Sequence, residues 1–338
     1  EERVVNMAEI KQNMLRERAK KLPEIADDQW ALVNSEYREL MEEFISAQSL
    51  SPKSKIQYRS VLKQFGWFVY EKLKNKRLCE ISKRDFIKYL SHLRDERKMS
   101  SSGQQTRKTI VSSFCNFIEN IIAEDEPDYK NFKNFTRGLP AIPKNKVYDK
   151  VKITHEEYLQ MMDVLEKDED YLGMAWLATA FNVGARRSEI IQFKSEIVNY
   201  DFGEGTFIMS HNIRLKGGGE DGKVEAYMIN KEAIKYIKVW LEKRGYDHEY
   251  IFTTKYNKEI SAMADSWADY FCKNKLSPIL GRRINPHLFK ASCVTHLLEQ
   301  GIPIEMVSKF IAHHESVATT IAHYDLRDFE DQKNNIFK

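Results

Sequence analysis

The sequence predicts a mainly α-helical protein of two domains, with a small antiparallel β-sheet in the second. Apolar residues recur at helical spacing over most of the chain, and strand-like alternation is confined to residues 205–229. A stretch rich in proline and glycine, residues 127–151, separates two apolar regions. The 338 residues are enough for two domains that each bury a core.

Residues 1–49 are expected to form an N-terminal helical arm. Helical apolar spacing covers residues 3–22 and 28–48. Residues 1–50 hold 7 Lys/Arg against 11 Asp/Glu, a balance of −4, which makes a poor contact for nucleic acid. Two roles stay open for this arm: an oligomerisation element, or a docking surface for a regulatory protein or peptide.

Residues 50–126 are expected to form a compact helical domain. Ser51-Pro52 is a helix-start signal, and Ser82 is typical of a helix N-cap. Residues 52–109 hold 16 Lys/Arg against 5 Asp/Glu, a balance of +11, which is typical of a protein that binds the phosphate backbone of nucleic acid. The alternative is a set of solvated helix faces. The expected DNA contacts in this domain are Lys53, Lys55, Arg59, Lys63, Lys83, Arg84, Arg107 and Lys108.

After a linker at residues 127–151, a second domain is expected over residues 152–338. Thr154 with Glu157 forms a capping-box pattern, and the apolar helical region that follows is interrupted at residues 182–184. The alternating stretch then surrounds a glycine-rich segment, Gly217 to Gly222, which predicts an antiparallel hairpin with a mobile tip. The rest of the chain is expected to be mainly helical.

Composition excludes several classes of protein. The first twenty residues are charged throughout and no apolar run reaches the length of a membrane span, so we expect a cytoplasmic protein without a membrane partner. The four cysteines show neither a disulfide framework nor zinc-ligand spacing. The histidines at 313, 314 and 323 lack a completing Cys or carboxylate pattern, so no metal and no cofactor is expected.

Five features that can handle a phosphodiester occur in one order along the second domain. Their residues are Arg186 in GARRSE, Lys216 at the hairpin tip, His287 with Lys290 one helical turn apart, His313 or His314, and finally Tyr324. Cationic and imidazole groups stabilise the charge that develops on phosphate oxygens under attack. A tyrosine hydroxyl can act as nucleophile, and a lysine can protonate the leaving oxygen.

This order of motifs resembles the tyrosine recombinase (phage integrase) superfamily over about residues 50–325. GARRSE, IRLKGG, NPHLFKASCVTHLLEQG, FIAHH and Tyr324 stand where that family has its conserved boxes. The resemblance implies a two-domain DNA clamp, with a helical core-binding domain and a mixed catalytic-type domain. It further implies that Arg186 and Lys290 grip the scissile phosphate, that His287 and His313 donate hydrogen bonds to it, that Lys216 is the general acid and that Tyr324 is the nucleophile. Arg282 and Arg283 join the expected DNA contacts.

Four departures from the family pattern bear on activity. Lys290 replaces a second arginine, so a planar fork is lost while a positive charge is kept. Ala312 replaces a glycine, the spacing from the histidine pair to Tyr324 is longer than in the family, and Glu220 with Asp221 makes the hairpin tip acidic.

Together these departures favour a sequence-specific double-stranded DNA-binding protein whose recombination activity is impaired or lost. A homo-oligomer on DNA is among the expected partners. A phage or mobile-element regulator fits, of the kind of the recombinase-fold repressors attributed to SPβ-like phages, with a role in transcription regulation and lysogeny. The alternatives are an active site-specific recombinase that forms a 3′-phosphotyrosine intermediate, and a structural DNA-bridging protein.

Overall fold

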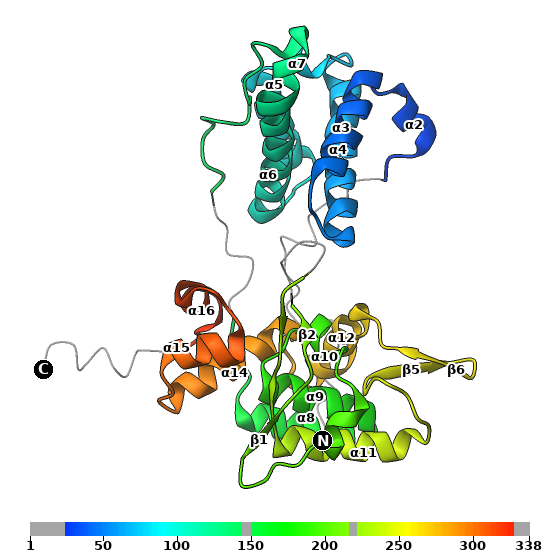
Figure 1. Ribbon diagram of the computed structural model, residues 1–338, viewed down its shortest axis with the longest axis vertical. Helices are drawn as coiled ribbons and strands as arrows, with labels where there is room; N and C mark the ends of the chain where they lie inside the picture. Colours follow the sequence, from blue (N-terminus) through cyan, green and yellow to red (C-terminus); the bar gives the residue numbers. More distant parts are fainter. Residues whose placement is uncertain (1–23, 144–149, 216–221, 328–338) are drawn as a thin grey trace, which may run out of the picture. The chain divides into compact units, whose positions relative to one another are not determined.

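The computed structural model describes residues 24–143, 150–215 and 222–327, which divide into two compact units (Figure 1). Each unit has its own hydrophobic core and is described by itself. The chain is mainly helical with small antiparallel strand pairs, which confirms the predicted fold class. None of the helices in these three ranges is long and apolar enough to cross a membrane.

The helical unit occupies the first described range. Its three long helices are α3 (Ser35–Ala47), α4 (Pro52–Lys72) and α6 (Ser101–Phe117). Shorter helical segments complete it: α2 (Asp27–Leu32), η2 (Leu78–Glu80), α5 (Lys83–Ser91), η3 (His92–Glu96), η4 (Ile118–Ile122), α7 (Ala123–Asp125) and η5 (Pro127–Tyr129).

The helix starts predicted in this unit are confirmed. Ser51 Oγ accepts a hydrogen bond from the Ser54 amide at 3.3 Å, and Pro52 takes the first helical position of α4. Ser82 Oγ accepts from the Asp85 amide at 3.2 Å, and the Asp85 carboxylate accepts from the Ser82 amide, which closes a capping box at the start of α5. Each cap satisfies amides that the helix itself leaves unpaired.

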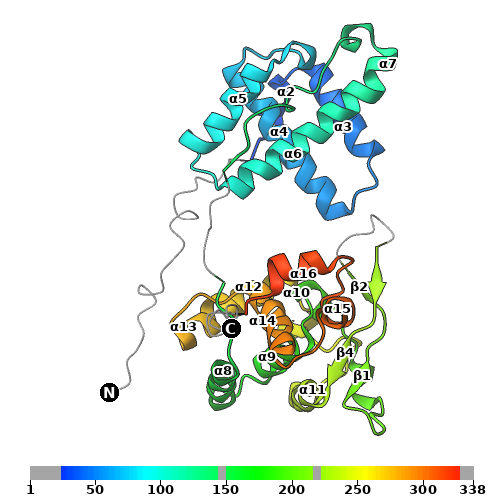
Figure 2. The same cartoon turned by 90° about the vertical axis from the view of Figure 1, so that its left-hand side faces the viewer.

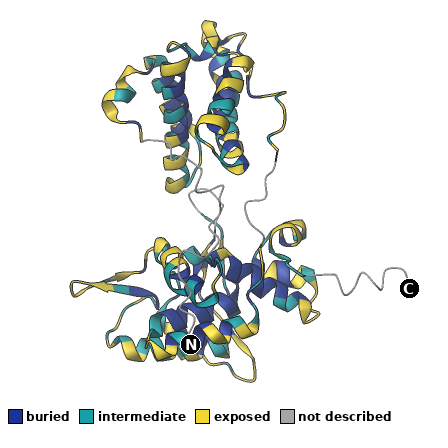
Figure 3. Ribbon diagram, turned by 180° about the vertical axis from the view of Figure 1, so that it is seen from behind, coloured by how far each residue is buried: buried dark blue, intermediate teal, exposed yellow. Residues whose placement is uncertain are grey.

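The core of the helical unit is built from aromatic side chains of α3, α4 and α6, whose inner faces are buried (Figure 3). Tyr37 of α3 packs edge-on against Phe114 of α6, with ring centroids 5.6 Å apart, and its hydroxyl donates to the Leu62 carbonyl of α4 at 2.9 Å. Gly66 lets α4 approach this ring, because a Cβ there would lie 2.7 Å from Tyr37 Cε1. Residues 33–45 therefore share the core of the basic domain, and the expected arm boundary at residue 50 does not mark a break in it.

The start of the expected linker also belongs to this core. Tyr129, Phe132 and Phe135 are buried, and Asn134 donates to the Asn116 side chain at 2.8 Å. Their spacing of three residues places the rings on one side of an irregular segment, a pattern too short to predict a helix.

The mixed unit holds the remaining described residues. Its main helices are α8 (His155–Lys167), α9 (Tyr171–Val183), α11 (Lys231–Arg244), α12 (Asp265–Phe271), α14 (Pro286–Glu299) and α16 (Val317–Tyr324). Shorter helical segments are α10 (Arg187–Ile190), η6 (Ser195–Asn199), η7 (Cys272–Leu276), α13 (Ser277–Leu280), α15 (Ile304–Met306) and η8 (Val307–Ala312). The capping box expected at Thr154 and Glu157 is present at the start of α8.

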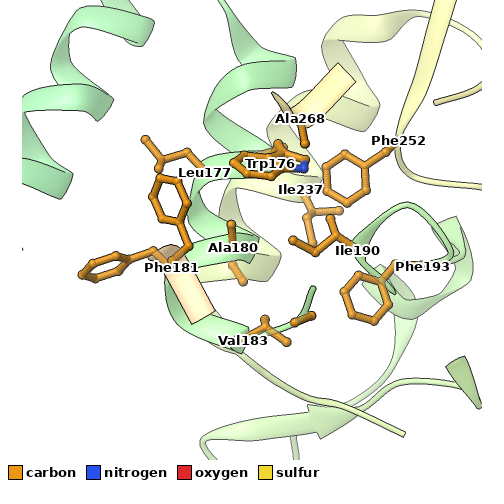
Figure 4. Close-up of a cluster of buried hydrophobic side chains, with 14 of the residues drawn as sticks. Trp176, Leu177, Ala180, Phe181, Val183, Ile190, Phe193, Ile237, Phe252 and Ala268 are labelled. Atoms are coloured by element: carbon orange, nitrogen blue, oxygen red, sulfur yellow. The ribbon is translucent and has the colours of Figure 1, made fainter. Parts of the chain in front are cut away.

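Helix α9 is the centre of this unit. It is buried along almost its whole length, and α8, α11 and α14 pack around it. Trp176 meets Phe271 and Phe289 edge-on, while Phe181 stacks on Tyr158 of α8 with centroids 4.4 Å apart. Figure 4 shows Trp176, Leu177 and Phe181 of α9 within a cluster of buried hydrophobic side chains. Gly184 ends α9 with φ +68°, which confirms the predicted break and turns the chain toward α10.

The strands in the described ranges form three two-stranded antiparallel pairs. β1 (Phe207–Met209) pairs with β4 (Met228–Asn230), and β2 (Ile213–Arg214) pairs with β3 (Val224–Glu225). The Ser210 amide donates to the Tyr227 carbonyl at 2.8 Å between these pairs, so the four strands form one continuous ribbon beside α11 (Figure 2). β5 (Thr253–Tyr256) and β6 (Glu259–Ala262) form a separate hairpin.

Candidate phosphate-binding site

Arg186 lies at the N-terminus of α10, directly after the turn at Gly184. Its Nη1 donates to Glu189 Oε1 at 2.7 Å, and its backbone amide donates to Glu189 Oε2 at 2.6 Å. The Arg186 side chain keeps 16% of its surface exposed, whereas the Glu189 side chain is fully buried. The ion pair therefore fixes the guanidinium at the edge of the core.

Glu189 is a buried anion that sequence reasoning did not single out, although it stands in the quoted GARRSE motif. Burial on its own would raise the pKa of its carboxyl, but the charges of Lys290 and Arg186 and a 2.6 Å hydrogen bond from the Tyr227 hydroxyl hold that pKa below its usual value. Tyr227, on the ribbon between β3 and β4, was also not predicted. Its only sequence signal was its place in a strand-like alternation.

Lys290 is fully buried on α14, and its Nζ has no hydrogen-bond partner among the described residues. Burial, reinforced by the nearby Arg186 charge and opposed by Glu189, lowers the pKa of this amine to about 7. The expectation that Lys290 keeps a full positive charge is therefore not met near neutral pH, because the loss of hydration disfavours the ammonium form.

The two histidines of FIAHH follow η8 and lie in the same region. The His313 ring contacts the Tyr227 ring edge-on at 4.4 Å, and His314 Nδ1 lies 2.8 Å from Thr320 Oγ1. Nε2 of each ring is buried without a hydrogen-bond partner in the described part of the chain. Burial, followed by the charge of Lys290, lowers the pKa of both rings to about 4, so both are neutral near pH 7.

Tyr324 ends α16 inside this group. Its ring centroid lies 4.6 Å from that of His314 and 6.0 Å from Lys290 Nζ. The Leu326 amide just beyond the tyrosine donates to Thr295 Oγ1 of α14 at 3.0 Å, which anchors the end of α16. The longer spacing from the histidine pair thus does not carry the tyrosine ring out of the cluster.

Two other residues were expected in this site, His287 and Lys216. His287 is exposed in the first turn of α14, one turn before the buried Lys290. Lys216, with the acidic residues Glu220 and Asp221 of the hairpin tip, lies outside the described residues.

The side chains expected to contact DNA differ in burial and in the hydrogen bonds and ion pairs that they form within the protein. Arg59 donates two hydrogen bonds to Glu42 of α3 at 2.6 and 3.0 Å, and Lys63 pairs with Asp27 at 3.8 Å. Arg282 is held by Glu157 and by the Val151 and Lys152 carbonyls. Arg107 bonds to the Gly103 carbonyl and the Gln64 side chain. Of the remaining expected positions, Lys53, Lys83 and Arg84 are exposed, and Lys55, Lys108 and Arg283 are half-buried.

The described residues contain no group of three His, Cys, Asp or Glu side chains placed to hold a metal ion. The site instead gathers one guanidinium, one amine and two imidazoles around a tyrosine, which is a donor set for an oxyanion.

Comparison with protein families places this chain in one class. The model of the phage integrase family matches residues 152–330, and the model of the phage integrase N-terminal SAM-like domain matches residues 37–121. The chain belongs to the phage integrase family of tyrosine recombinases.

Two relatives are similar over most of their length. The SPbeta prophage-derived recombinase-like protein YomM of Bacillus subtilis (strain 168) is 58% identical over 330 residues, which cover 97% of this chain and 98% of YomM. The tyrosine recombinase XerA of Pyrococcus furiosus is 25% identical over 291 residues, covering 83% of this chain and 87% of XerA.

Solved structures share the fold at low sequence identity. The Tn1549 transposon integrase in complex with circular intermediate DNA aligns with a TM-score of 0.66 at 16% identity, covering 90% of this chain and 99% of that one. A lambda integrase (75–356) dimer bound to a COC′ core site aligns with a TM-score of 0.63 at 14% identity, covering 87% and 96%.

Proposed function

We propose that the protein binds double-stranded DNA sequence-specifically and holds one backbone phosphate in the cluster around Tyr324, with recombination impaired or lost. The observation that supports this proposal is the set of buried polar atoms without partners: Lys290 Nζ and Nε2 of His313 and His314. A buried polar group left unpaired costs about 1 to 3 kcal/mol. Phosphate oxygens accept hydrogen bonds only, so a phosphodiester offers partners to the donors of this set and a counter-charge to Arg186.

The impairment of cutting follows from Lys290. A protonated lysine offers a point charge without the fixed two-pronged geometry of arginine, and with a pKa of about 7 only about half of these amines carry the charge at neutral pH. Loss of one fixed donor to the transition state slows such reactions by about a hundred- to a thousand-fold. DNA binding depends less on the geometry of this one side chain, because contacts to many phosphates together supply the binding free energy.

A regulatory role in a prophage or mobile element is the form of this function that we favour. The name of the relative YomM describes it as derived from the SPbeta prophage. The similarity between the two proteins extends over nearly the whole length of both chains. We propose a repressor that controls transcription and lysogeny, assembled on DNA as a homo-oligomer and open to a regulatory protein or peptide partner.

The second candidate is an active recombinase that forms a 3′-phosphotyrosine intermediate. The position of Tyr324 favours it, because the ring lies against His314 and Lys290 within one chain. The family relatives that carry the name tyrosine recombinase point the same way.

Two measurements separate these functions. The target is first selected from fragmented genomic DNA, and the affinity for it is compared with that for random duplex. A ratio within a few-fold contradicts the sequence-specific proposal, because specific binders exceed non-specific binding by about a thousand-fold or more.

The selected duplexes are then nicked at successive phosphates and incubated with the protein. The impaired-recombinase proposal predicts no covalent DNA adduct and an affinity that Tyr324→Phe leaves unchanged. An adduct that Tyr324→Phe abolishes establishes the recombinase instead. Lys290→Arg completes the design, since cleavage regained in this variant shows that the remaining site geometry is competent.

A further inference from the structure

Tyr227 is held rigidly where the strand ribbon meets the candidate site. Its amide donates to Ser210 Oγ at 2.9 Å, and its carbonyl accepts from the Ser210 amide at 2.8 Å. Its ring is buried and packs edge-on against Phe193 and His313, with centroids 5.9 and 4.4 Å away. Backbone and ring together fix the direction of the hydroxyl, which lies 2.6 Å from Glu189 Oε2.

The Tyr227 hydroxyl is a donor to this carboxylate. Burial and the charge of Glu189 raise the pKa of Tyr227 far above its usual value, so the hydroxyl keeps its proton. Glu189 Oε2 also accepts from the Arg186 amide at 2.6 Å, and Oε1 accepts from the Arg186 guanidinium at 2.7 Å. Both lone pairs of Oε2 are therefore used, and three hydrogen bonds fix the carboxylate.

Lys290 lies near this carboxylate without bonding to it. Against the effect of burial, the Lys290 charge lowers the pKa of Glu189, yet Nζ forms no hydrogen bond with any described residue. A buried ammonium and carboxylate gain by pairing, because neither is hydrated there. The titratable groups around this amine are Arg186 and Glu189 at the start of α10, Cys293 of α14, His313 and His314 after η8, and Tyr324 of α16. Of these groups, only Glu189 is a carboxylate.

We propose that Tyr227 is a positioning residue whose hydroxyl holds Glu189 away from Lys290, so that the buried amine stays available to a phosphate of the DNA backbone. The proposal rests on the proposed function, because it names the residue that keeps the amine of that same site unpaired. Without the hydroxyl, Glu189 Oε2 regains a free lone pair, and the unpaired Lys290 amine is a neighbouring donor for it. Carboxylate and phosphate then compete for one ammonium.

The first test measures the pKa of Lys290 in the DNA-free full chain. Tyr227→Phe keeps the ring and removes only the hydroxyl. In ¹³C-lysine-labelled protein, the Lys290 Cε signal is identified by its absence in Lys290→Arg and followed through a pH titration. We expect its pKa to rise from about 7 in the wild type to about 8 or higher in Tyr227→Phe, since a paired carboxylate favours the ammonium form.

Tyr158→Phe is the matched control for this titration. Tyr158 is a buried tyrosine of the same unit, and its hydroxyl donates to Glu232 at 2.8 Å. The control therefore removes a tyrosine–glutamate hydrogen bond outside the site, and the pKa of Lys290 is expected to stay at its wild-type value. An unchanged or lower pKa of Lys290 in Tyr227→Phe overturns the proposal.

The affinity for the selected DNA site gives the second readout. Near pH 6, we expect Tyr227→Phe to bind about ten-fold more weakly than the wild type, the effect of losing a hydrogen bond to a charged group. We also expect its affinity to start falling about one pH unit higher, a change that a purely structural role of Tyr227 would not produce. Wild-type affinity of Tyr227→Phe near pH 6 overturns the proposal. If the pKa of Lys290 rises as expected but the wild type itself does not bind DNA, the proposed function fails instead.

Discussion

Replacing Lys290 by methionine is expected to stabilise the protein near neutral pH. The pKa of this amine is about 7 in the folded protein, against 10.5 for a free lysine. Between these values the unfolded chain binds more protons than the folded one, so the free energy of unfolding rises with pH across this window. Each unit of difference between the two pKa values corresponds to about 1.36 kcal/mol. The shift from 10.5 to about 7 therefore sets an upper limit of about 5 kcal/mol on the destabilisation by the buried amine at pH 7.

The net increase in the free energy of unfolding that Lys290→Met brings is expected to be smaller than this limit. Glu189 loses one of its two cationic neighbours in the variant, although Arg186 and the Tyr227 hydroxyl still hold it. Methionine has a similar length and adapts to irregular space, and replacing buried charges by apolar side chains typically adds about 1 to 4 kcal/mol. We therefore expect a gain in that range at pH 7, which shrinks as the pH approaches 10.

Urea unfolding of wild type and Lys290→Met at pH 7, 8 and 9 measures both the gain and its pH slope. Lys238→Met is the matched control, because Lys238 is exposed on α11 and such changes stay within about 0.5 kcal/mol. A variant that is less stable than the wild type at pH 7, or that keeps the wild-type pH slope, refutes the assignment of a buried, easily deprotonated amine.

Three further predictions concern DNA affinity and the helical core. The affinity for the selected DNA site is expected to fall by up to about ten-fold per pH unit above pH 7, as Lys290 loses its proton while both histidines stay neutral. Fluorescence anisotropy measures this, and a slope that persists in Lys290→Arg assigns the titration to another group. Glu42→Gln is expected to tighten DNA binding several-fold by releasing Arg59, whereas Glu43→Gln, which removes the same charge one position along, shows the size of the general electrostatic effect; equal effects contradict a specific release. Gly66→Ala is expected to lower the thermal midpoint, because its Cβ meets the buried Tyr37 ring at 2.7 Å and overpacking costs about 1 to 3 kcal/mol; an unchanged midpoint contradicts the close approach of α3 and α4.

Short-range signals were sufficient for most of the local structure. The caps at Ser51, Ser82 and Thr154 depend on residues at most three positions away, and so does the glycine turn at Gly184. Contacts between distant segments were not predictable in this way. Residues 33–45 and the rings at 129, 132 and 135 join the helical core through partners more than ten positions away, which a charge balance or a proline-rich composition does not reveal.

In the candidate site too, the sequence predicted which residues take part but not the surroundings in which each side chain lies. The motifs named Arg186, Lys290, the histidine pair and Tyr324, but their pKa values depend on burial that no single motif encodes. Lys290 lies between the apolar residues Phe289 and Ala291, but no expectation of burial was drawn from these neighbours. The backbone of His313, the residue after η8, lies in the left-handed region (φ 52°, ψ 44°), and no motif in the sequence predicted this turn.

The charges of the free site and of the bound site differ in a way that links stability to DNA binding. Without DNA, Arg186 is balanced by Glu189 and Lys290 is about half charged at pH 7, so the cluster has little net charge to attract a distant anion. A phosphate held beside Lys290 raises the pKa of that amine, because an opposite charge favours the ammonium form. Lys290 then takes up a proton when the phosphate binds. Its ammonium charge, which destabilises the DNA-free protein, forms an ion pair with the bound phosphate. In the proposed function, the first attraction to DNA therefore comes from exposed lysines and arginines elsewhere on the chain, and the buried cluster contacts a phosphate only after the DNA backbone has been placed.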